Sequence, residues 1–204
     1  MPEPAPFPIG RSPFRAKGVL YLGTRTFFDA TVQGGFASLL EDIREPELRA
    51  FLAQPFLPAS FYDVMVVPAL LRYEAHALRM GVEPYLIHRT KWQAKKDLDG
   101  GVYGWILRLA NPSTIATRLP KLFGQMYDFG VVHVGEAVDN TSTAQMDGVP
   151  RVLSSWLSSS IRIYGEAALK LAGVKHVHID ARVEPSEVPG SVPMDRLTFE
   201  MGWR

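Results

Sequence analysis

Two histidines and an aspartate recur at every second residue near the C-terminal end of the sequence. His176, His178 and Asp180 fall on one face of a predicted strand, because side chains on a strand alternate with a period of two. With His133 from another predicted strand, they supply the donor types of a zinc or non-haem iron site. The opposite face of the strand is apolar, so the favoured interpretation is a solvent-facing row. A metal-dependent hydrolase using His176, His178 and Asp180 is the second alternative.

Serine and glycine patterns predict neither a nucleophile nor a phosphate cradle. Ser154-Ser155 and Ser158-Ser159-Ser160 lie inside a predicted helix, whereas a hydrolase serine sits on a strained strand-to-helix turn. The glycines at 100, 101 and 104 follow a helix and lack the preceding strand of a dinucleotide-binding loop. The sequence therefore predicts no catalytic residues and a protein that is not an enzyme.

Residues 88–96 hold the densest basic cluster, arranged around Trp92. Cations interleaved with an aromatic ring can bind phosphate groups, a nucleotide or an anionic lipid head. Asp97 and Asp99 partly neutralise the cluster, and such runs are common on the solvated face of an amphipathic helix. The solvated face is the favoured interpretation, and anion binding is left open. The basic members are His88, Arg89, Lys91, Lys95 and Lys96.

The composition narrows the class of protein. The 204 residues are 47% hydrophobic and 21% charged, with a net charge of +1, which is typical of a globular chain without a field that draws it onto nucleic acid. The absence of cysteine excludes disulfides, thiolate nucleophiles, thiolate metal sites and iron–sulfur clusters. The N-terminus lacks a secretory signal, and no apolar run approaches the roughly 18 residues of a membrane span. We expect a cytoplasmic protein.

The elements that must position these residues fall into a helical half and a half rich in strands. After a Pro-rich lead over residues 1–16, residues 19–22 read as a short strand, and helices follow over 35–43, 60–80, 84–98 and 111–126. Pro68 falls inside the second helix and is expected to kink it, and Pro120 disturbs the last.

From Gly130 onward the period changes to that of strands. Residues 131–138 and 141–146 flank an Asp139-Asn140 turn, and a helix opened by Pro150 runs to Gly173. Strands follow over 174–183 and 196–203. The order predicts an α+β fold with an N-terminal helical layer packed on a C-terminal antiparallel β-β-α-β-β sheet. We expect a single domain over residues 17–204.

Two segments carry a resemblance to a known family. Residues 103–130, YGWILRLANPSTIATRLPKLFGQMYDFG, resemble a stretch of uncharacterised myxobacterial proteins of about this length. Ala59-Ser60-Phe61-Tyr62 resembles the family's entry to its first long helix, with Asp63 in place of the usual proline. That family in turn resembles the ligand-binding fold of 4-vinyl reductase domains, haem–nitric-oxide/oxygen-binding domains and TRAPP vesicle-tethering subunits.

The resemblance implies cofactors that this sequence does not support. Phenol sensors of the 4-vinyl reductase type hold zinc with cysteines near the final hairpin, and residues 181–203 contain none. The haem version needs an axial histidine, for which His76 and His88 on predicted helices are candidates, and a Tyr-x-Ser-x-Arg clamp that occurs nowhere in the chain. The sequence therefore predicts no cofactor.

The resemblance also implies an apolar pocket, because the fold is known for such sites. Most large rings serve the core, yet Tyr and Trp can supply polar groups to a mainly apolar pocket. We therefore expect a sensory or carrier domain that binds a small apolar or amphipathic ligand in its helical layer. The first alternative is an interaction module that forms a homodimer or binds a signalling protein. The predicted ligand-binding residues are Phe61, Tyr62, Trp92, Trp105, Phe123, Tyr127, Trp156 and Tyr164.

Overall fold

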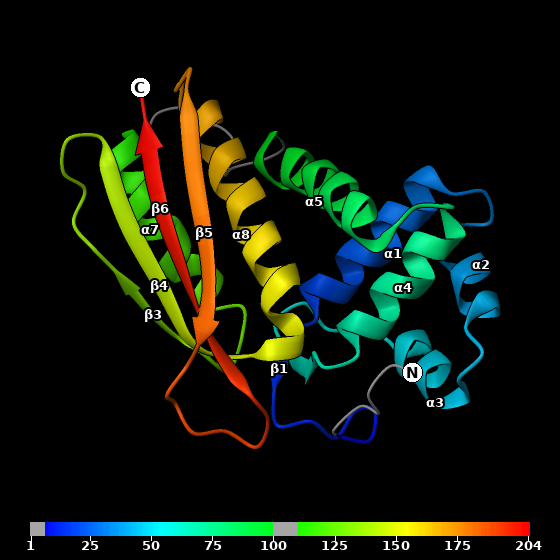
Figure 1. Ribbon diagram of the computed structural model, residues 1–204. Helices are drawn as coiled ribbons and strands as arrows, with labels where there is room; N and C mark the ends of the chain where they lie inside the picture. The colour runs from blue at the N-terminus through cyan, green and yellow to red at the C-terminus, as the bar shows by residue number, and fades with distance from the viewer. Residues whose placement is uncertain (1–6, 100–109) are drawn as a thin grey trace. The chain divides into compact units, whose positions relative to one another are not determined.

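The computed structural model describes residues 7–99 and 110–204, which divide into two compact units (Figure 1). Unit 1 comprises Met1–Leu86 and Met126–Asp128, and unit 2 comprises Ile87–Gln125 and Phe129–Arg204. Ser12 and Phe14, in the predicted lead, are buried in unit 1. A single domain over residues 17–204 stays a prediction.

Unit 1 is built from short helices and one small antiparallel ribbon. Strand β1 pairs with β2 from Arg15 opposite Asp63 to Lys17 opposite Phe61, and Ala16 forms a further bridge to Tyr127. Helix α5 begins in this unit and continues into unit 2. The elements are β1 (Arg15–Lys17), α1 (Val19–Thr31), α2 (Gly35–Asp42), α3 (Pro46–Ala53), β2 (Phe61–Asp63), α4 (Val67–Ala77) and α5 (Val82–Asp99).

The strand predicted over residues 19–22 is wrong, since these residues open helix α1. Locally the run of Val, Leu and Tyr favours a strand and Gly23 reads as its end. The buried positions Tyr21, Thr24 and Phe28 are instead spaced by three and four residues. That longer helical period decides the structure, because it places one apolar stripe against the core.

The kink predicted at Pro68 is also wrong. Residues 61–63 form β2, so helix α4 begins at Val67 and Pro68 occupies its first turn. Proline is tolerated there because an amide in the first turn has no intrahelical acceptor. The α2 and α5 segments are confirmed as helices close to their predicted bounds.

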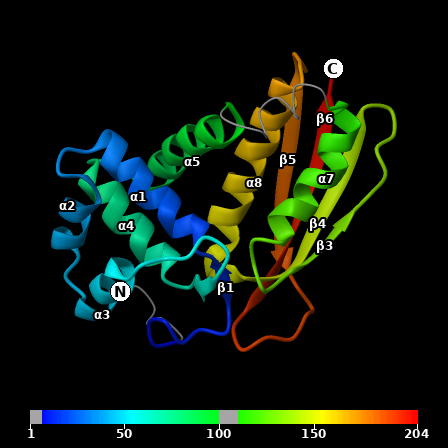
Figure 2. The same cartoon turned by 180° about the vertical axis from the view of Figure 1, so that it is seen from behind.

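Unit 2 confirms the predicted β-β-α-β-β order and the α+β class. Its sheet has the order β3-β4-β6-β5 with every pair antiparallel, and helices α7 and α8 cover one face of it (Figure 2). The elements are α7 (Pro112–Gly124), β3 (Val131–Val134), β4 (Thr141–Pro150), α8 (Arg151–Leu171), β5 (Val177–Pro185) and β6 (Met194–Trp203).

Local signals fix the boundaries of these elements. Asn111 caps α7 by accepting a hydrogen bond from the Ser113 amide at 2.9 Å, and Pro120 does lie inside that helix. Asp139 and Asn140 form the tight turn between β3 and β4 with φ of 49° and 60°. Within the described residues, no helix has both the length and the apolar character of a membrane span.

Candidate functional site

A wholly apolar cavity lies in unit 2 between helices α7 and α8 and the covered face of the sheet. It is small, with a volume of about 20 Å³, and it is partly open to solvent. No charged or hydrogen-bonding side chain lines it, so it is suited to an apolar molecule. The lining residues are Ile115, Ala116, Leu119, Pro120, Phe123, Ala144, Ile161, Gly165, Leu169, Ile179, Phe199 and Met201.

Helical and strand periodicities bring these side chains together. The α7 residues from Ile115 to Phe123 and the α8 residues Ile161, Gly165 and Leu169 follow steps of three and four, so each set lies on one helix face. Phe199 and Met201 are two residues apart on β6 and share its covered face. The cavity is therefore built on secondary structure and not on loops.

Three small residues line the cavity beside the larger ones. Ala116 and Ala144 are buried on opposite walls, and Gly165 is buried on α8. A Cβ atom at Gly165 would lie 2.9 Å from the Ile179 Cδ1 atom, so the helix approaches β5 closely at this point. Pro120 has no amide hydrogen to donate to the carbonyl of Ala116, which leaves the helical hydrogen-bond ladder interrupted beside the cavity.

Two of the predicted ligand-binding residues are associated with this cavity. Phe123 lines it, and the ring of Tyr164 packs edge-on against Phe123 with the centroids 5.4 Å apart. The Tyr164 hydroxyl donates to the Asp97 carboxylate at 2.8 Å. Tyr164 thus supports the Phe123 wall from behind while its polar group is bonded outside the cavity.

The other predicted residues occupy different positions. Trp92 lies on α5 with the Lys96 ammonium 5.2 Å from its ring, and Trp156 is half-buried on α8. Both belong to unit 2 without lining the cavity. Trp105 lies outside the described residues.

Phe61, Tyr62 and Tyr127 belong to unit 1 and do not line the cavity. Phe61 is 41% exposed. The Tyr62 ring packs on Phe56 at 4.7 Å. Tyr127 is buried, and desolvation raises the pKa of its hydroxyl. The predicted aromatic set as a ligand site remains a prediction.

The aliphatic lining was visible in the sequence only as a helical stripe. The periodicity places Ile115, Leu119 and Leu122 on one face, but Leu122 is 56% exposed and Phe123 takes its place. The contributions of Ala144 and Gly165 carry no sequence signal, since a small residue marks a cavity only once its neighbours are known.

The predicted metal-ligating side chains of β5, His178 and Asp180, face solvent. The His178 Nε2 and Asp180 Oδ2 atoms are 2.8 Å apart, with the two side chains 77% and 57% exposed. β3, which carries His133, is at the other edge of the sheet, about 14 Å from β5 at the usual strand spacing. Across residues 7–99 and 110–204, no three His, Asp or Glu side chains are grouped to hold a metal.

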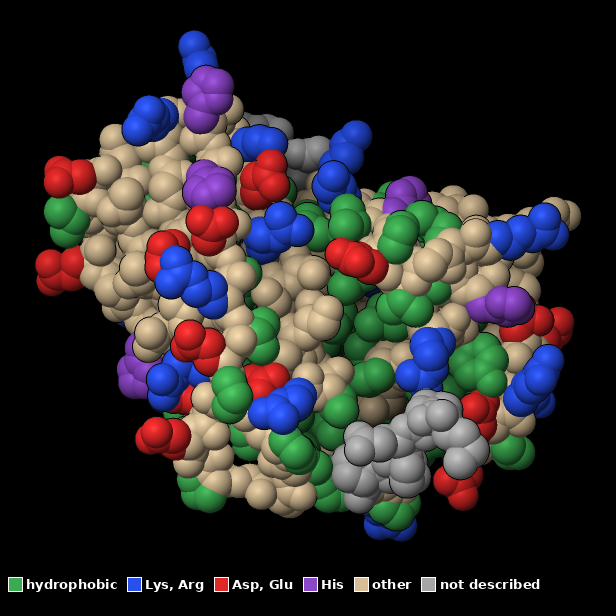
Figure 3. Space-filling view, viewed as in Figure 1, with side chains coloured by type: hydrophobic (Ala, Val, Ile, Leu, Met, Phe, Trp, Pro, Cys, Tyr) green, Lys and Arg blue, Asp and Glu red, His purple; other side chains and the backbone are tan. Residues whose placement is uncertain are grey.

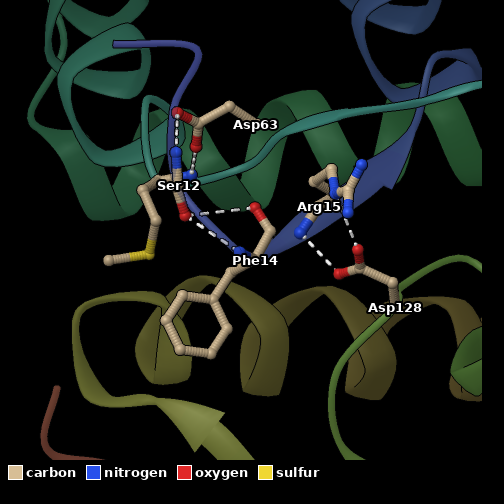
Figure 4. Close-up of polar contacts among 6 residues, drawn as sticks. Ser12, Phe14, Arg15, Asp63 and Asp128 are labelled. Atoms are coloured by element: carbon tan, nitrogen blue, oxygen red, sulfur yellow. Dashed lines mark hydrogen bonds and ion pairs between the residues drawn. The ribbon is translucent and has the colours of Figure 1, made fainter. Parts of the chain in front are cut away.

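A buried carboxylate organises unit 1 (Figure 4). Asp63 Oδ2 accepts from the amides of Gly10 and Ser12 at 2.8 and 3.2 Å, and Oδ1 accepts from the Met65 amide at 2.8 Å. Nearby, Asp128 accepts from the Arg15 amide at 2.6 Å and from Arg15 Nε at 3.0 Å. With three backbone donors, Asp63 fastens the N-terminal segment to β2.

The fold is similar to that of solved H-NOX domains, the haem–nitric-oxide/oxygen-binding class. A point variant of Tt H-NOX is 8% identical with a TM-score of 0.63 and covers 92% of this chain and 95% of its own. An H-NOX structure concerned with haem redox potential and porphyrin distortion is 11% identical with a TM-score of 0.60, covering 91% and 99%.

An Fe(II) unliganded H-NOX protein from K. algicida is 10% identical with a TM-score of 0.50, covering 92% and 96%. No family model and no curated protein matches the chain. At these identities the comparisons establish the fold alone.

The residues of this chain do not fit a haem held by an axial histidine. The five histidines of the sequence, His76, His88, His133, His176 and His178, are all exposed, and residues 100–109 contain none. An axial ligand must reach an iron inside a largely buried porphyrin. With no cysteine and no Tyr-x-Ser-x-Arg sequence, the thiolate and the expected propionate clamp are missing as well.

Proposed function

We propose that this protein is a non-enzymatic sensory or carrier domain that binds a small apolar molecule, or the apolar part of an amphipathic one, in the unit 2 cavity. The observation that carries the proposal is the lining itself. All its side chains are apolar, and the small side chains of Ala116 and Ala144 lie on opposite walls. Ligand pockets in proteins are typically concave and mainly apolar, and the small size of this cavity restricts its ligand to a compact molecule.

The cavity favours shape over hydrogen bonding as the basis of recognition. A polar ligand would lose its hydrogen bonds to water without replacement, which costs about 1–3 kcal/mol per group. A compact hydrocarbon loses none and gains the contacts of the aliphatic and aromatic walls. Hydrocarbon rings and short branched chains are therefore the ligand class that we propose.

Xenon and benzene are suitable probes of two different sizes, because both bind dry apolar cavities. Three isoleucines, Ile115, Ile161 and Ile179, line the cavity, so their Cδ1 methyl signals report occupancy in NMR spectra. We expect saturable shifts of these three methyls with benzene. The signals of Ile43, buried in unit 1, should not shift.

A filled-cavity variant provides the matched comparison. Ala116→Leu adds three carbon atoms to the α7 wall and should weaken benzene binding at least about tenfold, because it removes the space that the probe occupies. Leu122→Ala changes an exposed residue of the same helix and should leave binding unchanged. Equal binding to Ala116→Leu and to the unaltered protein would refute the cavity as the site.

Native mass spectrometry before and after organic extraction asks whether a ligand co-purifies. A mass difference that disappears on extraction and is absent from Ala116→Leu supports the function. Failure of benzene, xenon and extracted cell lipids to bind the folded protein would instead favour the interaction module.

A further inference from the structure

The two outer strands of the unit 2 sheet are unequal. β3 has four residues, whereas β5 has nine and pairs with β6 from Val177 to Pro185 without a register shift. No strand of the described chain pairs with the second side of β5. A long outer strand without a bulge is a ready template for another strand, and proteins usually shorten, bulge or cover such an edge.

The backbone of β5 presents regularly spaced donors and acceptors at this edge. Just before the strand, His176 and Arg204 exchange both backbone hydrogen bonds, at 3.0 and 2.9 Å. In an antiparallel pair such residues alternate with residues whose N–H and C=O groups point away from the partner. Even-numbered residues of β5 therefore bond β6, and Ile179, Ala181 and Val183 direct their amides and carbonyls to the open edge.

The side chains on the open face of β5 are arranged so that the strand complements itself. His178, Asp180, Arg182 and Glu184 follow one another at every second position. When a second β5 runs antiparallel with Ala181 opposite Ala181 of the second copy, each Asp180 lies opposite an Arg182 and each His178 opposite a Glu184. These are non-hydrogen-bonded pairs, in which the Cβ atoms are about 5 Å apart.

The charges also disfavour the neighbouring registers. Only residues of the same parity can pair, because odd-numbered residues carry the outward amides. Centring the pair on residue 180 places Asp180 opposite its own copy, and centring it on residue 182 does the same for Arg182. Like charges directly opposite one another are destabilising, so the charge pattern favours Ala181 over these two registers, and only the register centred on Ala181 pairs all four residues with opposite charges.

Unit 2 by itself leaves two features that a second strand would resolve. Asp180 lies opposite Glu200 of β6, a like-charge pair, while Arg182 contacts Glu200 at 3.3 Å. An Arg182 from a second copy adds a positive charge beside Asp180. On the covered face, Val183 is 46% exposed and would gain Ile179 of the second copy as its cross-strand neighbour.

We propose that β5 is a homodimerisation strand, which pairs with β5 of a second copy around a two-fold axis at Ala181 and joins the two four-stranded sheets into one. The mixture of acidic, basic and histidine side chains over the open sheet face is visible in Figure 3. The occupant is a second copy because the same four residues supply both halves of every charge pair.

Sedimentation velocity on the full chain tests the proposal through complementary charge reversals. Asp180→Arg places an arginine opposite Arg182 of the second copy, and Arg182→Asp places an aspartate opposite its Asp180, so each variant alone should raise the dimer dissociation constant at least about tenfold. An equimolar mixture of the two should recover the dimer, because every pair across the axis is then opposite in charge. Lys121→Glu, an exposed reversal on α7, should have no effect.

Recovery in the mixture cannot arise from two misfolded variants, so the test separates association from folding. Ala181→Pro adds a backbone test: it removes an amide that points to the open edge, where proline is tolerated, and should yield a folded monomer. A wild-type chain that stays monomeric at every concentration would overturn the proposal. So would folded charge variants that fail to associate when mixed, or a dimer that survives Ala181→Pro unchanged.

Discussion

Asp63 shows how one buried carboxylate can hold a segment that has little structure of its own. Its two oxygens accept hydrogen bonds from the backbone amides of Gly10, Ser12 and Met65. In Asp63→Asn one oxygen becomes an NH2 group that faces a backbone donor. We expect the free energy of unfolding to fall by about 2 kcal/mol, measured by urea denaturation.

Asp128 provides the matched control for Asp63. Its contact with Arg15 is partly exposed, with the two side chains 25% and 55% accessible. Exposed ion pairs contribute roughly 0–1 kcal/mol, so Asp128→Asn should destabilise less. Equal losses for the two variants would contradict a special role for the buried carboxylate.

Asp147 is a second residue whose environment has a measurable consequence. Hydrogen bonding from the Ser186 hydroxyl, followed by the Arg196 guanidinium at 2.8 Å, lowers the pKa of its carboxyl. A lowered folded-state pKa adds stability above the unfolded value of about 3.9, and that stability is lost as the pH falls through the folded value.

We therefore expect Asp147→Asn to reduce the free energy of unfolding at neutral pH. The difference from the unaltered protein should shrink on acidification below about pH 4. Ser186→Ala should raise the pKa of Asp147 toward its ordinary value in a carboxyl 13C titration. A pKa of Asp147 that is the same with and without Ser186 would show that the hydroxyl is not the main cause.

At the scale of elements, the turn between β3 and β4 is the clearest case of local sequence fixing structure. Asp139 and Asn140 both have positive φ, and Val138 and Thr141 exchange hydrogen bonds of 2.9 and 2.8 Å across them. Asn140→Gly should preserve stability because glycine is favoured in this turn, whereas Asn140→Val should cost about 1–2 kcal/mol. Thermal unfolding of the two variants compares them directly.

The elements that the sequence predicts well are those with such local signals. The Asn111 cap, the Asp139-Asn140 turn and the glycine after α8 mark boundaries through backbone chemistry that needs no tertiary partner. Residues 19–22 and Pro68 were misassigned for the opposite reason. Whether Tyr21 belongs to a helix depends on what buries Phe28, and where α4 begins depends on β2 pairing with β1.

The candidate site was predicted only in part for a related physical reason. Phe123 has the bulk that marks a wall, and its α7 stripe has the right period. Ala144 leaves room because its side chain is small, and Gly165 lets Ile179 approach α8 closely. Neither effect can be recognised without the neighbouring elements. A cavity is a property of packing between elements, and a single sequence does not encode that packing locally.

At the scale of the whole molecule, the fold suggests a haem site, whereas the positions of the histidines do not. The solved structures with this fold include ones that carry haem, yet every histidine of this chain is exposed. We expect protein produced in haem-supplemented cells to lack the Soret band of a stoichiometric histidine-ligated haem. Added haemin should bind weakly, in a manner that His76→Ala and His88→Ala leave unchanged.

The two histidine variants distinguish a histidine-ligated haem from haemin bound without an axial histidine. A tight stoichiometric complex whose absorption bands disappear in one of them would identify an axial ligand and contradict the argument from exposure. Weak binding that is the same in both variants and in the unaltered protein would confirm that neither histidine is an axial ligand. The cavity of unit 2 is too small and too apolar to take a porphyrin with two carboxylates, so such binding would be to the surface of the protein.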